Sequence, residues 1–189
     1  PHFLYNTLDT IVWMAEFNDS KRVVEVTKSL ARYFRLALNQ GHEQIALKDE
    51  IDHVRQYLFI QKQRYGDKLQ YEIEEDESIA DYKLPKLVLQ PLVENAIYHG
   101  IKEIDRPGII RVTSTVEEGK LVLSIYDNGR GFDLLDSSEK TLLRLGGVGL
   151  KNVDQRLKLQ FGEDYHMEIR SEQDIFTLIK IYLPLSNDK

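Results

Sequence analysis

Three short segments, each combining glycine with polar side chains, constrain this chain more than any other feature of its sequence. They are Glu94–Gly100, Asp127–Gly131 and Gly146–Leu150. The first continues an apolar helical run, the second is an acidic glycine turn, and the third is a glycine loop that opens a helix. Together they predict a nucleotide pocket with a metal ligand, a carboxylate that contacts adenine and a cradle for phosphates.

Asn95 is the main candidate in the first segment. Mg²⁺ takes hard oxygen ligands and keeps several waters, so one amide oxygen plus triphosphate oxygens is a suitable set. A lone Asn is more often a helix cap or a surface amide, so this interpretation depends on the other segments. Glu94 fits a general base, a group that holds a water, or a surface acid. His99 fits a phosphate contact or simply the end of the helix.

Asp127 ends a predicted strand and enters the second segment. A carboxylate accepts a hydrogen bond from the exocyclic amine of adenine, whereas guanine has an oxygen at that position. Gly129 and Gly131 allow backbone angles and close approaches that a Cβ would block. Asp-Asn-Gly is also ordinary turn chemistry, so a simple hairpin turn is the alternative.

The third segment places Gly147 and Gly149 before the helix of Leu150 and Lys151. Backbone N–H groups at the start of a helix bind phosphate, and Lys151 is one of several candidate cations among which the sequence does not choose. No Gly-Lys-Ser/Thr follows, which excludes a Walker A loop, and the strand context of a dinucleotide fold is missing. The polar stretch 133–144 is a candidate lid over the nucleotide.

Residues 1–66 have the apolar spacing of three amphipathic helices with short connections. On the first helix, the angular spacing places His2 and Asn6 on a face turned to solvent. A neutral imidazole is a competent nucleophile for phosphorus, and Asn6 is a candidate for orienting a water in the reverse, dephosphorylating reaction. The apolar stripe of this helix consists of Leu4, Leu8, Ile11, Val12 and Ala15.

The apolar faces of these three helices are wide, which predicts half of a bundle completed by a second copy, that is, a homodimer. The remaining histidines, His42, His53 and His166, have no companions that suggest chemistry, and we expect them on the surface.

Residues 67–189 change to a pattern of strands and two helices. A strand near 69–74 precedes a helix that Pro85 opens, with Pro91 inside it as an expected kink or irregular turn. Two strands joined by a hairpin turn at residues 117–120, a helix to about residue 161 and two final strands follow. The prediction is an α+β protein: a helical region, then an α/β sandwich with a mixed, mainly antiparallel sheet and its helices on one face.

Composition excludes several classes. The 25 basic and 31 acidic residues give a net charge of −6, which argues against nucleic acid as the main partner. The absence of cysteine excludes disulfides, thiolate catalysis and cysteine-ligated zinc. No apolar run is long enough to span a membrane. Because the chain opens with Pro-His inside a helical pattern, we expect a C-terminal piece of a longer protein, with any membrane attachment upstream.

In this order, the segments resemble those of the LytS/YesM-like sensor histidine kinases, which pair a phosphoacceptor helical region with an ATP-binding domain of the Bergerat (GHKL, HATPase) fold. His2–Asn6 is similar to their phosphoacceptor box, Leu89–Gly100 to their N box, Asp127–Gly131 to their G1 box, and Gly147–Asn152 to their G2 box. The resemblance covers nearly the whole chain.

The resemblance implies a division into a dimerisation and phosphoacceptor region, 1–66, and an ATP-binding catalytic domain, 67–189. It implies that His2 accepts phosphate from Mg·ATP, that Asn95 binds Mg²⁺ and that Asp127 contacts adenine. The family's proteins are membrane-anchored bacterial homodimers whose cytoplasmic portion passes the phosphoryl group to an aspartate in the receiver domain of a response regulator.

Two positions depart from related patterns. The more common histidine-kinase box has an acid directly after the histidine, but here Phe3 follows, so the general base is open and Glu94 is a candidate. Related gyrase and Hsp90 ATPases have a catalytic Glu one turn before the Asn, where this chain has Pro91, which disfavours an ATPase that moves domains. Two hypotheses remain: a histidine autokinase, or a catalytically silent ATP-binding dimeric interaction module.

Overall fold

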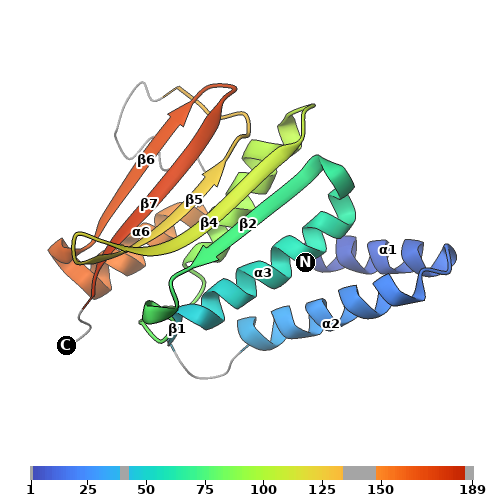
Figure 1. Ribbon diagram of the computed structural model, residues 1–189, viewed down its shortest axis with the longest axis horizontal. Coiled ribbons are helices and arrows are strands. Elements are labelled where there is room, and N and C mark those ends of the chain that lie inside the picture. Colours follow the sequence, from blue (N-terminus) through green and yellow to red (C-terminus); the bar gives the residue numbers. More distant parts are fainter. Residues whose placement is uncertain (1, 39–42, 134–147, 186–189) are drawn as a thin grey trace.

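The computed structural model of the chain describes residues 2–38, 43–133 and 148–185. Figure 1 shows a five-stranded sheet, helices behind it, and a helical hairpin that extends from one edge. The longer helices are α1 (His2–Glu16), α2 (Ser20–Ala37), α3 (Leu47–Tyr65), α4 (Leu89–Asn95) and α6 (Val148–Phe161). The strands are β1 (Gln44–Ala46), β2 (Leu69–Glu75), β3 (Lys83–Pro85), β4 (Gly108–Glu117), β5 (Lys120–Asp127), β6 (His166–Glu172) and β7 (Phe176–Pro184).

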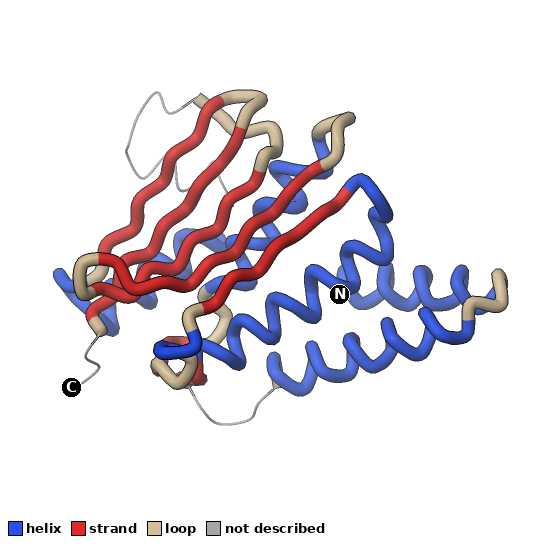
Figure 2. Tube along the Cα trace, viewed as in Figure 1, coloured by secondary structure: helices blue, strands red, loops and turns tan. Residues whose placement is uncertain are grey.

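The large sheet has the strand order β2-β4-β5-β7-β6. Strands β2 and β4 are parallel, and every other neighbouring pair is antiparallel. Glu118 and Gly119, both with positive φ, form the predicted β4–β5 hairpin turn. The inner face of the sheet shares one apolar core with α3, α4 and α6 (Figure 2). The predicted α+β fold, with a mixed, mainly antiparallel sheet covered by helices on one face, is confirmed.

The helices α1 and α2 form an antiparallel hairpin that packs on α3 (Figure 1). Asp19 caps α2, because its carboxylate accepts the backbone N–H of Arg22 at 3.3 Å. A small core of Met14 and Val26 in the hairpin closes against Ile60 of α3. The three predicted helices are therefore all present.

Helix α3 contributes to two cores. While Ile60 faces the hairpin, Ile51, Val54 and Leu58 are buried in the core of the sheet. The predicted division at residue 66 consequently falls at the end of a helix that packs against both parts of the chain. That boundary stays a prediction.

The helix predicted to begin at Pro85 begins at Leu89 instead. Pro85 is the last residue of β3, which pairs antiparallel with β1. Leu87 then takes a left-handed conformation, with φ of +59°, and turns the chain into α4. Strands of three residues are too short to show an alternating pattern, so the sequence did not indicate this small second sheet.

Pro91 is the third residue of α4, in its first turn. N–H groups in the first turn have no partner inside a helix, so Pro91 removes no helical hydrogen bond there. The irregular part of the helix comes after Asn95, where η3 (Ala96–Gly100) is a single π-helical turn. Such turns often mark functional sites.

The predicted apolar stripe of α1 is only partly buried. Leu8 and Val12 are 44% and 56% exposed, whereas Thr7 and Met14 are buried. Thr7 is accommodated inside because its hydroxyl donates to the carbonyl of Phe3 at 2.8 Å. The hairpin therefore leaves apolar side chains of α1 uncovered.

The expectation that His53 lies on the surface is wrong. Its side chain is 2% exposed and stacks on Tyr33 with ring centroids 4.3 Å apart. Neither ring nitrogen has a hydrogen-bond partner among the described residues. Helix α3 is packed on more than one side, which a one-face pattern does not reveal. His166 is exposed as expected, and His42 lies outside the described residues.

Burial lowers the pKa of His53 from 6.5 to about 4, with Asp52 opposing the shift. Because the folded protein holds this group neutral, protonation favours the unfolded chain. The contribution of His53 to the free energy of unfolding should therefore be constant above about pH 6.5. It should fall by about 3 kcal/mol as the pH drops to 4.

We expect His53→Phe, which keeps a ring against Tyr33, to lose less stability than the wild type between pH 7 and pH 4.5. Urea denaturation at several pH values measures this difference. His166→Phe, at an exposed position, is the control and should follow the wild type. Parallel curves for wild type and His53→Phe would contradict the assignment.

Candidate nucleotide-binding site

A cavity of about 390 Å³ lies between the α4–η3 helix and the adjoining ends of β5 and β7. Its wall is one face of that helix, and its floor is the end of β5. It is lined by Leu92, Asn95, Ala96, His99, Gly100, Glu103, Ile125, Asp127, Arg130, Gly131, Phe132, Asp133, Gln173, Thr177 and Ile179. The structure thus brings the first two predicted segments together at one site.

Asp127 is a buried carboxylate on the floor of the cavity, 4% exposed. One oxygen accepts the backbone N–H of Gly129 at 2.9 Å, and no cationic side chain pairs with Asp127 among the described residues. Burial raises the pKa of Asp127 from 3.8 to about 7, and the Gly129 N–H opposes this. Thr177 stands opposite Asp127 in the β5–β7 register and is also buried. The sequence alone did not single out Thr177.

Glycines surround the Asp127 carboxylate because no other residue fits. A Cβ on Gly100 would collide with Asp127, and a Cβ on Gly129 would collide with both Gly100 and Asp127. Gly131 has φ of +55°, and a Cβ there would strike the backbone of Glu172. The close approach that the motif predicted for Gly129 and Gly131 is therefore present, and it extends to Gly100 at the end of the first segment.

The loop after β5 is held in place by Arg106. Its guanidinium donates to the carbonyls of Asn128 and Gly129 in the loop and, at 2.9 Å, to the carbonyl of Asp174 in the β6–β7 turn. The side chain of Asn128 accepts the backbone N–H of Ile109 at 2.6 Å. The shape of the cavity floor thus depends on contacts from β4 and from the β6–β7 turn, which the sequence did not indicate.

Asn95 and Glu94 lie on different sides of α4. Asn95 lines the cavity, and its Nδ2 is buried with no hydrogen-bond partner among the described residues. Glu94 does not line the cavity. Its carboxylate accepts from Gln90 Nε2 at 2.9 Å, and the same Nε2 lies 3.5 Å from the Tyr33 hydroxyl of α2, so this side of the helix faces α2. There, burial and the negative charge of Glu94 raise the pKa of the Tyr33 hydroxyl.

Only one of the remaining motif residues in the described part of the chain lines the cavity. His99 lines the cavity, whereas Gly149, Leu150 and Lys151 do not. Gly149 lies against Pro91 of α4, Leu150 is buried in the core, and Lys151 is exposed. Gly147 and almost all of the candidate lid lie outside the described residues.

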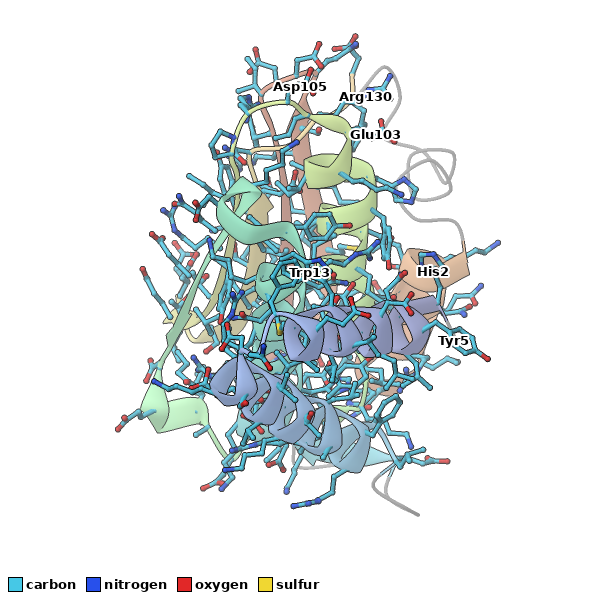
Figure 3. All side chains as sticks on the ribbon, turned by 90° about the vertical axis from the view of Figure 1, so that its right-hand side faces the viewer. His2, Tyr5, Trp13, Glu103, Asp105 and Arg130 are labelled. Atoms are coloured by element: carbon cyan, nitrogen blue, oxygen red, sulfur yellow. The ribbon has the colours of Figure 1, made fainter. Side chains whose placement is uncertain are left out.

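His2 is exposed at the start of α1, as predicted, and does not line the cavity. The side chain of Asn6 approaches its ring, with Nδ2 2.9 Å from His2 Nδ1. Figure 3 shows His2 well below the ion pair between Glu103 and Arg130 that borders the cavity. Phe3, next to His2, packs on Tyr33 and Tyr57 with centroids 4.9 Å away from each. The acceptor candidate and the cavity are therefore separate in this arrangement.

Two family models match the chain. Residues 1–69 match the family model described as histidine kinase, and residues 80–187 match that of histidine kinase-, DNA gyrase B- and HSP90-like ATPases. The chain is 35% identical over 190 residues to the sensor histidine kinase YesM of Bacillus subtilis, covering 100% of this chain and 32% of YesM. It is 35% identical over 184 residues to BtsS of Escherichia coli, covering 97% of this chain and 31% of BtsS.

Solved structures agree with this fold. The histidine kinase AdeS of Acinetobacter baumannii superimposes with a TM-score of 0.57 at 16% identity, covering 93% of this chain and 85% of that one. The histidine kinase domain of the blue-light activated kinase EL346 from Erythrobacter litoralis has a TM-score of 0.56 at 18% identity, covering 94% and 87%. At such identities the likeness shows the fold alone.

The chain therefore belongs to the histidine kinase family, with an ATP-binding part of the gyrase B- and HSP90-like ATPase type, and the LytS/YesM-like resemblance is confirmed. ATP binding is a property of that ATPase family. The chain spans about a third of the length of the curated relatives it matches. In its described part, no helix has the length and apolar character needed to cross a membrane.

The raised pKa of Asp127 predicts a stabilising substitution. Since its folded pKa of about 7 exceeds the unfolded value of 3.8, ionisation favours the unfolded chain. The free energy of unfolding should fall as the pH rises from about 4 to 7. Asp127→Asn removes that loss, and we expect it to be more stable than the wild type by about 2–4 kcal/mol at pH 8.

Urea denaturation at pH 5 and pH 8 tests this expectation. Asp105→Asn, a change at an exposed acid, is the matched control and should leave the pH dependence unaltered. If wild type and Asp127→Asn lost stability equally between the two pH values, the folded carboxyl would not be the source of the effect.

Proposed function

We propose that this chain is the catalytic part of a two-component sensor histidine kinase, which binds Mg·ATP in the cavity and phosphorylates itself on His2. The observation that carries the proposal is the buried carboxylate of Asp127, which has no cationic partner among the described residues, packs against glycines and shares its cavity with Asn95. A desolvated carboxylate without a cation is costly, which is expected where a ligand's amine is its partner.

Adenine would lie on the cavity floor. The Asp127 carboxylate would accept a hydrogen bond from the exocyclic amine, and the glycine backbone would allow the base to approach closely. Ile125 and Ile179 supply apolar surface for the ring. The triphosphate would extend along α4 and η3 toward Asn95 and His99.

The residues present fit a magnesium ion. Asn95 lines the cavity and its side chain makes no hydrogen bond among the described residues, so its amide oxygen is free to bind an ion. In the described part of the chain no three His, Asp or Glu side chains form a metal site, so Asn95 would hold the ion together with phosphate oxygens. Mg²⁺ bound at Asn95 would neutralise charge on the phosphates.

In the proposed reaction, a ring nitrogen of His2 forms a bond to the γ-phosphorus while the bond from that phosphorus to the bridging oxygen breaks, and ADP leaves. In the structure the Asn6 amide donates from Nδ2 to His2 Nδ1 and so orients the ring. With the amide turned over, its oxygen would accept from Nδ1–H and leave the Nε2 lone pair for attack. Asn6 would also orient a water in the reverse reaction. Glu94, on the α4 face toward α2 and the Phe3 contacts, remains the proposed base.

A homodimer is part of this proposal. Four apolar or aromatic side chains of α1 lie open to solvent, at exposures of 44% to 64%: Tyr5, Leu8, Val12 and Trp13. A second copy packed on this face would complete the helical bundle. The receiver domain of a response regulator would then take the phosphoryl group from His2. Since the matched relatives are about three times longer, we propose that the chain is the cytoplasmic portion of a membrane-anchored bacterial sensor.

The second candidate is a catalytically silent ATP-binding dimeric module. It is favoured by one observation, the position of His2 outside the cavity. For the kinase reaction, α1 has to approach the nucleotide, either by a rearrangement within the chain or by the use of a second copy.

Labelling with γ-³²P-ATP and Mg²⁺ distinguishes the two functions. We expect wild type to acquire an acid-labile, base-stable label, and His2→Ala to lose at least about 99% of it because the nucleophile is gone. Asn95→Ala should lose both the label and Mg·ATP binding, whereas His2→Ala should keep binding. His166→Ala, at another exposed histidine, is the matched control and should label normally. Nucleotide binding without any label would instead support the silent module.

A further inference from the structure

Glu50, in the first turn of α3, is a carboxylate with no exposed surface. Its two oxygens accept from two different backbone N–H groups, Oε2 from Leu87 at 2.9 Å and Oε1 from Leu89 at 2.8 Å. No cationic side chain pairs with it among the described residues. Burial raises the pKa of Glu50, and the N–H groups of residues 87–90 oppose the shift.

This carboxylate replaces a local cap. Val88, at the N-cap of α4, has no capping side chain, and the preceding Leu87 holds a left-handed φ of +59°. A Ser or Asp at position 88 would cap the helix locally, as these residues usually do. The chain instead caps α4 with a side chain 39 residues earlier. The cap therefore also fixes the start of α4 to α3, which a local capping side chain would not do.

The fixed helix carries the metal-site candidate. Asn95 is the last residue of α4, and its side chain makes no hydrogen bond that would orient it among the described residues. Its position over the cavity therefore follows from the position of the helix backbone. The turn that precedes α4 is also tied to α6, because Arg156 donates to the carbonyl of Lys86 at 2.8 Å.

We propose that Glu50 is a positioning residue for metal-dependent nucleotide binding: by fixing the start of α4 to α3, it places the Asn95 amide where Mg²⁺ and the phosphates meet. This inference rests on the proposed Mg·ATP site. Adenine binding at Asp127 depends on it less directly, because Asp127 lies on β5, which the Glu50 contacts do not involve.

Calorimetry of the chain with Glu50→Gln tests the proposal. Gln keeps the shape of Glu, but its NH₂ group faces a backbone N–H, so at least one of the two contacts is lost. We expect Mg²⁺ with a non-hydrolysable ATP analogue to bind at least about tenfold more weakly, while ADP in EDTA changes by less than about twofold. Asp49→Asn makes the same charge change one residue earlier, at a carboxylate with no hydrogen bond to α4, and should bind both nucleotides like the wild type.

Hydrogen exchange at residues 92–100 provides a second readout and should accelerate in Glu50→Gln but not in Asp49→Asn. Equal Mg²⁺-dependent binding by the two variants would overturn the proposal. An equal loss of ADP and Mg²⁺-dependent binding in Glu50→Gln would also overturn it, because a general loss of structure would then suffice. If the wild type bound neither nucleotide, the proposed function itself would fail. If the wild type bound both nucleotides and Glu50→Gln bound them equally well, only the role of Glu50 would fail.

Discussion

Two buried carboxylates bracket the helix that forms the wall of the nucleotide cavity, and neither pairs with a cation among the described residues. Glu50 holds the start of α4, and Asp127 lies against Gly100 at the end of the π-helical turn. A buried carboxylate is tolerated only where hydrogen-bond donors replace its water, so each fixes the backbone that surrounds it. The wall and the floor of the cavity are thereby held in register before any ligand arrives.

The two carboxylates differ in how many of their oxygens are already used by backbone hydrogen bonds. Both oxygens of Glu50 are used by backbone N–H groups, whereas Asp127 accepts one backbone N–H and otherwise faces the cavity. The first is consistent with a structural tie and the second with a group kept for a ligand. Keeping an under-bonded carboxylate in the interior reduces stability, a common feature of sites built for binding.

The sequence predicted the parts of this site that depend on local chemistry. Asp127, Gly129 and Gly131 were identified because a carboxylate followed by glycines fits an adenine contact, although the same turn also fits a simple hairpin, and Asn95 because of its place on a helix in the same chain. The alternating strands and the hairpin at Glu118 were predicted for a similar reason, since their signals span only a few residues.

What the sequence did not reveal depends on contacts between distant residues. The burial of His53, the capping of α4 by Glu50 and the support of the Asp127 loop by Arg106 all arise from tertiary packing. Polar side chains on a helix are normally predicted to face solvent, and only the packing of α3 against both α2 and the sheet turns His53 and Glu50 inward. The strands β1 and β3 were missed because three residues carry no periodicity.

In the proposed function, Asp127 selects adenine through its exocyclic amine. Competition calorimetry with ATP and inosine triphosphate, which has an oxygen in place of that amine, measures this selection. We expect ATP to bind at least about thirtyfold more tightly in the presence of Mg²⁺, because inosine would leave the buried carboxylate facing an oxygen. Equal affinities for the two nucleotides would contradict it.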